Sequence, residues 1–415
     1  MIVLEGRILN PASEDVFRGR IVIDGGKIVD CGKSGEVDIP EGAKLYEVDG
    51  TIMPGLIDAH VHYTGFRTGD YIKEGLLTPF GVFVARAIRD LQATLDAGYT
   101  TICDAGSVVA LHLRDAINEG TVEGPRIVAA GYPLSQTFGH GDLHFLPTDL
   151  VDPRTSPLNF PFQSLLCDGE DEFRKGARYA LREGADFIKI FVTGGVASQK
   201  DRPDYPQMTP GEIRAVVEEA KRAKRFVHAH AESSEGYINA VEGGVEVLAH
   251  GMDLNDDAIN LSVERDVTLI PTLTIADIIL KLGSAAGLPD WVIEKTKEVH
   301  DVHRESVKRA YKAGVRIATG TDFFIGSKEV QLYGLNSMEI KLLHDVGMSE
   351  MDVLKAATCN AAIAAKLNTG SLEAGKLADV IVVDGDPLDN PAVLLNKNKI
   401  VMVIKDGRIV KRNSK

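Results

Sequence analysis

The middle of the sequence alternates eight times between a short apolar, strand-like run and a helix-like or mixed segment. The first run leads into His60, and the others cover residues 100–104, 126–130, 187–192, 226–230, 245–250, 267–271 and 316–321. Glycines stand where helices should end before the next strand, at Gly98, Gly184, Gly244 and Gly314. Eight strand–helix units with parallel strands predict an α/β protein, a (β/α)8 TIM-type barrel.

Two of the connecting helices are predicted over residues 211–225 and 291–313, whereas residues 131–170 predict a long loop. Loops of that length usually have a functional role. A second loop that we expect to influence specificity covers residues 198–207.

Both ends of the chain have the pattern of short β-strands. Gly25-Gly26 and Asp406-Gly407 each separate two strand-like runs by two residues, which is typical of a tight hairpin. The two ends are therefore predicted to pair as one small β-sandwich domain. The predicted boundaries are 1–52 and 371–415 for the sandwich and 53–370 for the barrel.

The composition of the chain limits the classes of binding partner and the cellular compartment that we expect. The net charge of −14 argues against nucleic acid and anionic membranes as partners. The four cysteines form no Cys-x-x-Cys pair, which favours buried thiols in a reducing compartment. There is neither a signal-peptide pattern at the start nor an apolar run of about 20 residues. We therefore expect a cytoplasmic protein. We also expect it to be a homo-oligomer.

Polar side chains occur where five of the predicted barrel strands end, which is where barrel enzymes place their active sites. One buried histidine alone is more often a core residue, but a whole set of buried polar groups costs free energy unless it is paired. A metal centre would satisfy these groups together, because neutral imidazole and carboxylate are ligands for zinc and similar ions. The candidates are His60 and His62, Lys189, His228 and His230, His250, and Asp322.

Six motifs, taken in this order, resemble those of the amidohydrolase superfamily, and more narrowly its imidazolonepropionase-like and dipeptidase-like group. They are Pro-Gly-Leu-Ile-Asp-Ala-His-Val-His at 54–62, Ile-Lys-Ile-Phe-Val-Thr-Gly-Gly-Val at 188–196, His-Ala-His-Ala at 228–231, Leu-Ala-His-Gly at 248–251, Thr-Gly-Thr-Asp at 319–322 and the run from Gly375 to Pro387. The resemblance covers nearly the whole chain. It implies a distorted barrel with a flanking β-sandwich.

The resemblance also implies two divalent metal ions, with zinc expected, bridged by a carbamate formed from Lys189 and CO2. A desolvated lysine has a lowered pKa, and its neutral amine can react in this way. Carried over, one ion is held by His60, His62 and Asp322, and the other by His228 and His250. The family pattern favours His228 over His230 as the ligand, which leaves His230 to face the substrate, but the choice between them stays open.

The implied reaction is hydrolysis of an amide bond by a metal-bridging hydroxide, with Asp322 and His250 as the catalytic groups. Asp322 would accept the proton of the water and pass it to the leaving amine. The expected substrates are dipeptides such as Xaa-Pro and Xaa-Arg/Lys, or N-acyl amino acids. Their C-terminal carboxylate would be bound by His140 and His230, with Arg202 as a further candidate.

Three other functions were considered. A deaminase or cyclic-amide hydrolase of the imidazolonepropionase kind usually has one metal, lacks the lysine, and has a glutamate three residues after the fifth-strand histidine. Ala231 occupies that position after His228, and Glu232 follows it. A non-catalytic relative would lack some ligands, whereas none is missing here. Lactone or phosphotriester hydrolysis stays open because a metal centre does not select the electrophile. Five further histidines are predicted to be ordinary, with His303 on a solvated helix face: His112, His144, His300, His303 and His344.

Overall fold

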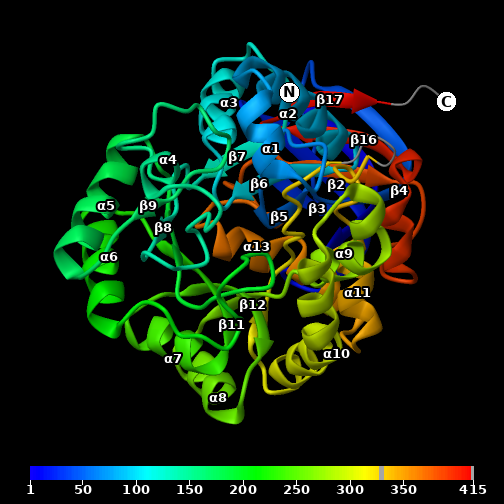
Figure 1. Ribbon diagram of the computed structural model, residues 1–415. Coiled ribbons are helices and arrows are strands. Elements are labelled where there is room, and N and C mark those ends of the chain that lie inside the picture. The colour runs from blue at the N-terminus through cyan, green and yellow to red at the C-terminus, as the bar shows by residue number, and fades with distance from the viewer. Residues whose placement is uncertain (327–330, 413–415) are drawn as a thin grey trace.

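The two ends of the chain meet in a single seven-stranded sheet in the computed structural model, which describes residues 1–326 and 331–412. The strand order is β17-β16-β15-β4-β1-β2-β3, so strands from the first and the last part of the chain belong to one sheet (Figure 1). The central contact pairs β4 antiparallel to β15. The strands are β1 (Ile2–Asn10), β2 (Asp15–Asp24), β3 (Lys27–Lys33), β4 (Lys44–Pro54), β15 (Val380–Val383), β16 (Ile400–Lys405) and β17 (Arg408–Arg412).

Both predicted hairpin turns are confirmed by their backbone angles. Gly25 and Gly26 have φ values of 53° and 84°, and Asp406 and Gly407 have 49° and 72°. Two consecutive positive φ values match the right-handed twist of the adjoining strands, which is why glycine and aspartate suit these positions.

All eight strands predicted for the middle of the chain are present, and all pair in parallel. They belong to a three-stranded sheet, β5-β6-β7, and a seven-stranded sheet, β14-β13-β12-β11-β10-β8-β9. The strands are β5 (Leu56–Val61), β6 (Tyr99–Asp104), β7 (Arg126–Ala129), β10 (Ile188–Phe191), β11 (Val227–Ser233), β12 (Val247–Asp253), β13 (Thr268–Ile270) and β14 (Arg316–Ile317).

Backbone hydrogen bonds link these two parallel sheets at both of their ends. Ala59 donates to the Thr319 carbonyl and Asp322 donates to the His60 carbonyl, so β5 lies beside the segment that follows β14. At the other end, Asp186 donates to the carbonyl of Ala129 at the end of β7. The ends of β5, β11, β12 and the segment after β14 are thereby held close together.

Helices connect the parallel strands, as the alternation in the sequence predicts. The expected helices at 211–225 and 291–313 correspond to α6 (Pro210–Arg222) and α10 (Asp290–Lys312). The glycines predicted to end helices have positive φ values between 91° and 100° at all four positions. The other helices are α1 (Tyr71–Leu77), α2 (Phe80–Asp96), α3 (Val108–Asn118), α5 (Glu170–Arg182), α7 (Ser234–Glu242), α8 (Asp256–Glu264), α9 (Leu273–Ala286), α11 (Met338–Asp345), α12 (Glu350–Ala356), α13 (Cys359–Ala364) and the short 3-10 helices η1 (Pro391–Leu395) and η2 (Lys397–Lys399).

The segment predicted as a long loop, 131–170, contains regular structure. Strands β8 (Leu134–Ser135) and β9 (Leu165–Leu166) pair in parallel and extend the larger parallel sheet, with the one-turn helix α4 (Thr148–Val151) between them. The remaining part of this segment covers the ends of the parallel strands and supplies His140.

The predicted boundary between the two units, at residues 52 and 53, lies inside strand β4. Strand β4 ends at Pro54, Gly55 follows, and β5 begins at Leu56. The domain limits and the two-layer sandwich therefore stay predictions, whereas the joining of the two chain ends in one sheet is observed. Within the described part of the chain, no helix is both long and apolar enough to cross a membrane.

Candidate metal centre

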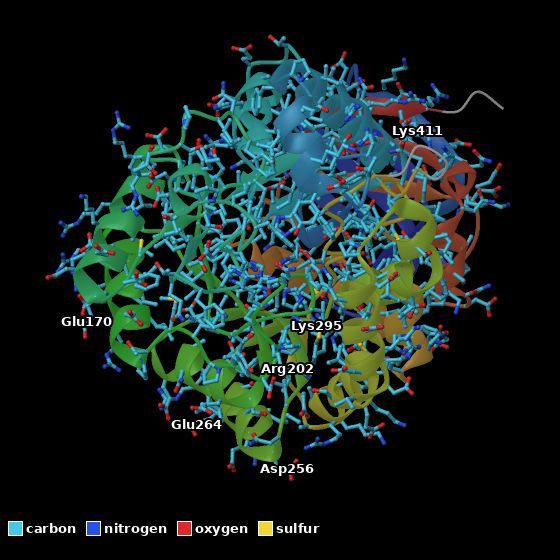
Figure 2. All side chains as sticks on the ribbon, in the orientation of Figure 1. Glu170, Arg202, Asp256, Glu264, Lys295 and Lys411 are labelled. Atoms are coloured by element: carbon cyan, nitrogen blue, oxygen red, sulfur yellow. The ribbon has the colours of Figure 1, made fainter. Side chains whose placement is uncertain are left out.

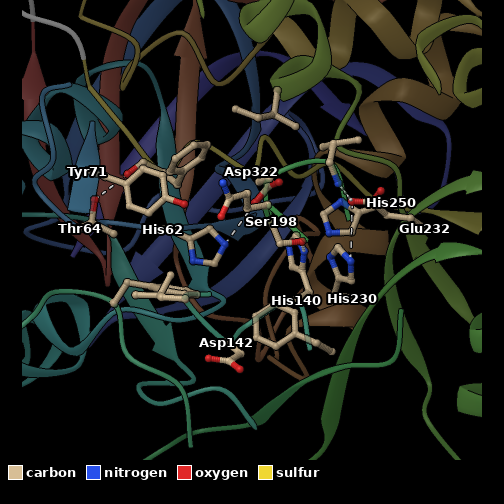
Figure 3. A pocket seen from close by; sticks show the side chains of 18 of the residues that line it. His62, Thr64, Tyr71, His140, Asp142, Ser198, His230, Glu232, His250 and Asp322 are labelled. Carbon is tan, nitrogen blue, oxygen red and sulfur yellow. Dashed lines mark hydrogen bonds and ion pairs between the residues drawn. The ribbon is translucent and has the colours of Figure 1, made fainter. Parts of the chain in front are cut away.

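The predicted site residues come from different strands but face a single pocket. Seven of its lining residues are candidates from the sequence, and the candidates His228 and Arg202 do not line it. Figure 3 shows His62, Asp322, His140, His230 and His250 directed toward this common space. The lining candidates are His60, His62, His140, Lys189, His230, His250 and Asp322.

The first group that could hold a metal consists of His60, His62 and Asp322. Their ligand atoms lie within 4.8 Å of one another, and Oδ1 of Asp322 is 3.3 Å from Nε2 of His60 and 3.2 Å from Nε2 of His62. The two histidines point the same way because they are two residues apart at the end of β5. No other such group of three His, Cys, Asp or Glu ligands occurs among residues 1–326 and 331–412.

Asp322 is held in place by its own backbone and by its neighbours. Its φ is 56°, a left-handed conformation that non-glycine residues rarely adopt and that is often found at functional sites. One position earlier, Thr321 donates to buried Asp58 through both Oγ1 (2.7 Å) and its backbone N–H (3.2 Å). Burial alone would raise the pKa of Asp322, but the hydrogen bond from His62 and the positive charge of Lys189 help to lower it to about 2. The carboxylate is therefore ionised at neutral pH.

Strand β11 directs three polar side chains to its inner face, at every second residue: His228, His230 and Glu232. His228 pairs in register with Lys189 on β10, and its Nε2 lies 2.9 Å from Nδ1 of His60. His228 thus contacts His60 but does not itself line the pocket. His230 lies two residues nearer the mouth and lines the pocket, with its ring centroid 4.6 Å from that of His250.

Lys189 lies below this cluster and is 1% exposed. Its Nζ makes no hydrogen bond to any described residue, and it is 5.6 Å from the centre of the Phe191 ring. Burial lowers the pKa of its amine from 10.5 to about 7, although the charge of Asp322 partly opposes this. Such a lysine has a large neutral fraction at physiological pH, which makes its amine nucleophilic.

The position of His250 is fixed by three hydrogen bonds that approach from different sides. Its φ is 76°, and its Nδ1 lies 2.8 Å from Oγ1 of Thr272, which is itself left-handed. Nε2 of His303 donates to the His250 carbonyl over 3.0 Å, and Ser306 donates to the next carbonyl, that of Gly251. His303 is 0% exposed, so the prediction that it lies on a solvated helix face was wrong. The charged neighbours of His303 lie on other faces of α10, which packs against β12.

The buried histidines of the cluster are neutral. Burial lowers the pKa of His60, His228, His230 and His250 well below 6.5, although the charge of Asp322 partly opposes this for His250 and His228. Neutral imidazole is the form that binds metal ions. In several of these histidines, one ring nitrogen makes a hydrogen bond to a neighbouring residue. The other ring nitrogen is therefore the one available to a metal ion.

His140 reaches the cluster from the segment between β8 and α4. Its ring stacks on that of His230 with 4.2 Å between centroids, and its Nδ1 lies 2.8 Å from Oγ of Ser198. Burial lowers the pKa of His140 to about 4. The segment that carries Ser198 is held by Lys295 of α10, which donates to the carbonyls of Gly195, Ser198 and Asp201.

Arg202, a candidate for binding a substrate carboxylate, does not line the pocket. It pairs with Glu298 at 3.0 Å and with Asp204 at 3.6 Å, and its side chain is 49% exposed. Arg202 lies near Lys295 (Figure 2). Because its charge is already paired at the surface, Arg202 is not brought together with the other candidates.

Sequence reasoning missed Glu232 as a pocket residue, and treated His144 as ordinary although it also lines the pocket. The signal for Glu232 was available, because it continues the every-second-residue pattern of His228 and His230. The prediction ended the strand at residue 230, whereas β11 extends to Ser233.

The rest of the pocket is largely aromatic and aliphatic, and its empty space measures about 1010 Å³ including the open mouth. A binding site that is mostly apolar with a few convergent polar groups is typical for small molecules. Among the described residues that line it, Lys189 is the only lysine or arginine. The apolar walls include Phe66, Phe145, Phe162, Phe191, Ile275 and Phe324.

The sequence and the fold are similar to those of known proteins. The amidohydrolase family matches residues 51–410. Ochratoxinase from Aspergillus niger is 31% identical over 433 aligned positions, which cover 99% of this chain and 86% of that protein. Among solved structures, a prolidase complexed with N-methylphosphonate-L-proline has a TM-score of 0.89 at 32% identity, with 99% of this chain and 100% of that chain covered. A Xaa-Pro dipeptidase with bound methionine has a TM-score of 0.86 at 30% identity and covers 99% of each chain. The chain therefore belongs to the amidohydrolase family of hydrolases.

Proposed function

We propose that this protein hydrolyses amide bonds of small substrates at a centre of two divalent metal ions, and that the two parallel sheets together form the barrel that the sequence predicts. One observation carries the proposal: the buried amine of Lys189 has no hydrogen-bond partner among the described residues, yet it lines the same pocket as the histidines and an ionised aspartate. An unpaired buried amine costs free energy. Conversion to a carbamate that contacts two cations would remove that cost.

The residues present fit two ions. His60, His62 and Asp322 would hold the first. The second would lie between His230 and His250, with the carbamate of Lys189 shared between the two sites. This assignment revises the sequence-based choice of His228.

The ring nitrogens support the revision. Nδ1 of His250 lies by Thr272 and Nε2 of His230 lies 3.1 Å from the Gly194 carbonyl, so each ring has its other nitrogen available to an ion. His228, in contrast, uses Nε2 toward His60, and does not line the pocket. We assign it the role of orienting His60, as hydrogen-bonded partners commonly do for metal ligands.

Divalent ions at this position would lower the pKa of a water molecule and polarise the scissile carbonyl. The protein supplies the remaining functions. Asp322 is ionised and can accept a proton at its carboxylate and return it to the leaving amine. His250 orients the reacting groups from the opposite side of the cluster. The apolar walls exclude bulk water and bind the non-polar part of the substrate.

The substrates that we propose are dipeptides and N-acyl amino acids. Two solved relatives above 25% identity are named as a prolidase and a Xaa-Pro dipeptidase, and both cover nearly the whole chain. His140 is the proposed contact for the carboxylate of the substrate, since Arg202 is paired elsewhere and His230 is assigned to the metal. Its hydrogen bond to Ser198 fixes the orientation of the ring.

The test is a panel of dipeptides and N-acyl amino acids, each with its C-terminal amide counterpart, assayed with Zn²⁺, Co²⁺ and Mn²⁺. We expect turnover of part of the panel and a loss of about ten- to a hundred-fold in kcat/KM on amidation, the size of a lost charged hydrogen bond. No turnover of the panel, together with rapid turnover of a cyclic amide or a lactone, would refute the proposed substrates.

The ligand assignment has its own matched test. His230→Ala should lose one of the two ions, whereas His228→Ala should retain both with lowered affinity at the His60 site. Metal content after dialysis against a weak chelator distinguishes these outcomes. Loss of an ion from the His228 variant alone would restore the original assignment.

A further inference from the structure

Glu232 is a buried carboxyl group that lines the pocket and has one oxygen without a hydrogen-bond partner among the described residues. Its side chain is 2% exposed and lines the pocket, where Figure 3 shows it beside His250. Oε1 accepts a hydrogen bond of 3.3 Å from the backbone N–H of Val196. Oε2 accepts none from any described residue. A buried acceptor without a donor costs free energy, so this oxygen needs a partner that the chain itself does not supply.

The neighbouring groups do not account for Glu232. It is not part of the three-ligand group formed by His60, His62 and Asp322. Nε2 of His230 is 3.7 Å from Oε1, beyond hydrogen-bond distance, and lies closer to the Gly194 carbonyl. The nearest lysine that could help, Lys295, donates instead to three backbone carbonyls.

Glu232 also lies next to the proposed substrate contact. A Cβ atom at Gly195 would lie 2.4 Å from Cε1 of His140 and 2.7 Å from Oε1 of Glu232. The absence of a side chain at Gly195 therefore lets the backbone approach both groups at once. A substrate held by His140 would bring its other polar groups within reach of this carboxyl.

We propose that Glu232 binds an ammonium or guanidinium group of the substrate, either its free α-amine or a basic side chain. The inference rests on the proposed amide hydrolysis and adds to it a residue that selects cationic substrates. A cation supplies the missing donor to Oε2 and offsets the charge of a carboxylate removed from water. Since Lys189 is the only lysine or arginine that lines the described pocket, no other basic residue there competes for this carboxylate.

The experiment compares substrates that differ only in the cationic group. One arm uses Ala-Phe and N-acetyl-Ala-Phe, which differ in the α-amine. A second arm uses N-acetyl-Phe-Lys and N-acetyl-Phe-norleucine, and a third uses N-acetyl-Lys-Phe and N-acetyl-norleucyl-Phe. The wild-type enzyme should prefer the charged member of one pair by about ten- to a hundred-fold in kcat/KM. The arm that shows the preference identifies the source of the cation.

Glu232→Gln keeps the size of the side chain and the acceptor for Val196, and should reduce that preference to less than about threefold. Glu232→Asp retains the negative charge, so this variant should still prefer the charged member of the pair. Asp142→Asn is the matched control, because Asp142 also lines the pocket but already accepts a hydrogen bond of 2.9 Å from Phe138. Its charge preference should equal that of the wild type. Metal content should be unchanged in the Gln variant.

A readout independent of turnover is the binding of L-lysine and L-norleucine, measured by titration calorimetry with the metal-loaded protein. If the cation comes from a side chain, L-lysine should bind more tightly to the wild type and lose that advantage in Glu232→Gln. Turnover of the neutral members with no preference in any wild-type pair would overturn the role of Glu232 and leave amide hydrolysis intact. Loss of metal from Glu232→Gln would also overturn it. No turnover of any peptide would instead refute the proposed function.

Discussion

Replacing Lys189 with methionine tests directly whether its amine is buried without a partner. Methionine has a similar length but no polar atom, so it can fill the same space. In the metal-free protein the pKa of Lys189 is lowered from 10.5 to about 7. The unfolded chain therefore binds more protons than the folded one between about pH 7 and 10.5, and the stability of the wild type should rise with pH across this window.

The size of the effect follows from the shift. Each pKa unit corresponds to about 1.4 kcal/mol, so the lysine destabilises the folded metal-free protein by about 4 kcal/mol at pH 7 and by about 1 kcal/mol at pH 10. With an unfolding entropy of about 2.1 cal/mol/K per residue, about 4 kcal/mol corresponds to a difference in Tm of about 5 °C for this chain. The Lys189→Met variant should exceed the wild type by that amount at pH 7 and by little at pH 10.

The assay is thermal unfolding in CO2-free buffers that contain a chelator, at pH 7, 8.5 and 10. Lys175→Met serves as the control, since Lys175 is exposed on α5 and its replacement should leave the pH dependence of Tm unchanged. Equal pH dependence in the wild type and Lys189→Met would refute the claim that this lysine is desolvated. A Lys189→Met variant that is less stable at pH 7 would refute it as well.

Two further substitutions test the geometry of the pocket and of its supporting shell. Gly195→Ala would place a Cβ 2.4 Å from Cε1 of His140. It should lower kcat/KM by about 5- to 150-fold, because His140 would lose one hydrogen bond and one ring stack. Gly81→Ala is the control, since Gly81 has open space around it, and this variant should have wild-type activity in the same assay. His303→Leu removes the donor to the His250 carbonyl. It should weaken metal binding by about ten- to a hundred-fold, measured by competition with a chelator. Unchanged metal affinity would show that His303 does not position His250.

Most of the strand–helix order could be predicted, because it depends on local patterns. The eight apolar runs and the helix-ending glycines each carry their own signal. Strand β4, at Lys44–Pro54, gives a weak local signal because its sequence is mixed and contains Gly50. That strand is stabilised by distant partners, with β1 on one side and β15 on the other.

The choice between His228 and His230 could not be made from the sequence alone. Both lie on the same face of β11, and alternation cannot tell which of them reaches the pocket. The register of β11 against β10 makes the difference, since it places His228 level with Lys189 and His230 level with Phe191. Register of this kind depends on long-range pairing.

The buried position of His303 was also not predictable from its neighbours. Helix α10 is strongly charged, and the residues around His303 are typical of a solvated face. The packing of α10 against β12 turns His303 inward, and only the tertiary structure shows this contact. The same helix supplies Lys295, so a helix expected to be mostly a connector supports two sides of the site.

The most direct test of the two-metal proposal is the number of metal ions per chain. The measurement is elemental analysis of wild-type protein purified without chelator, with activity determined on the same samples and Lys189→Met analysed in parallel. The account predicts two divalent ions per wild-type chain, activity that falls as they are removed, and loss of metal and activity in the variant. A reproducible single ion per chain with full activity, or full metal content in Lys189→Met, would contradict it.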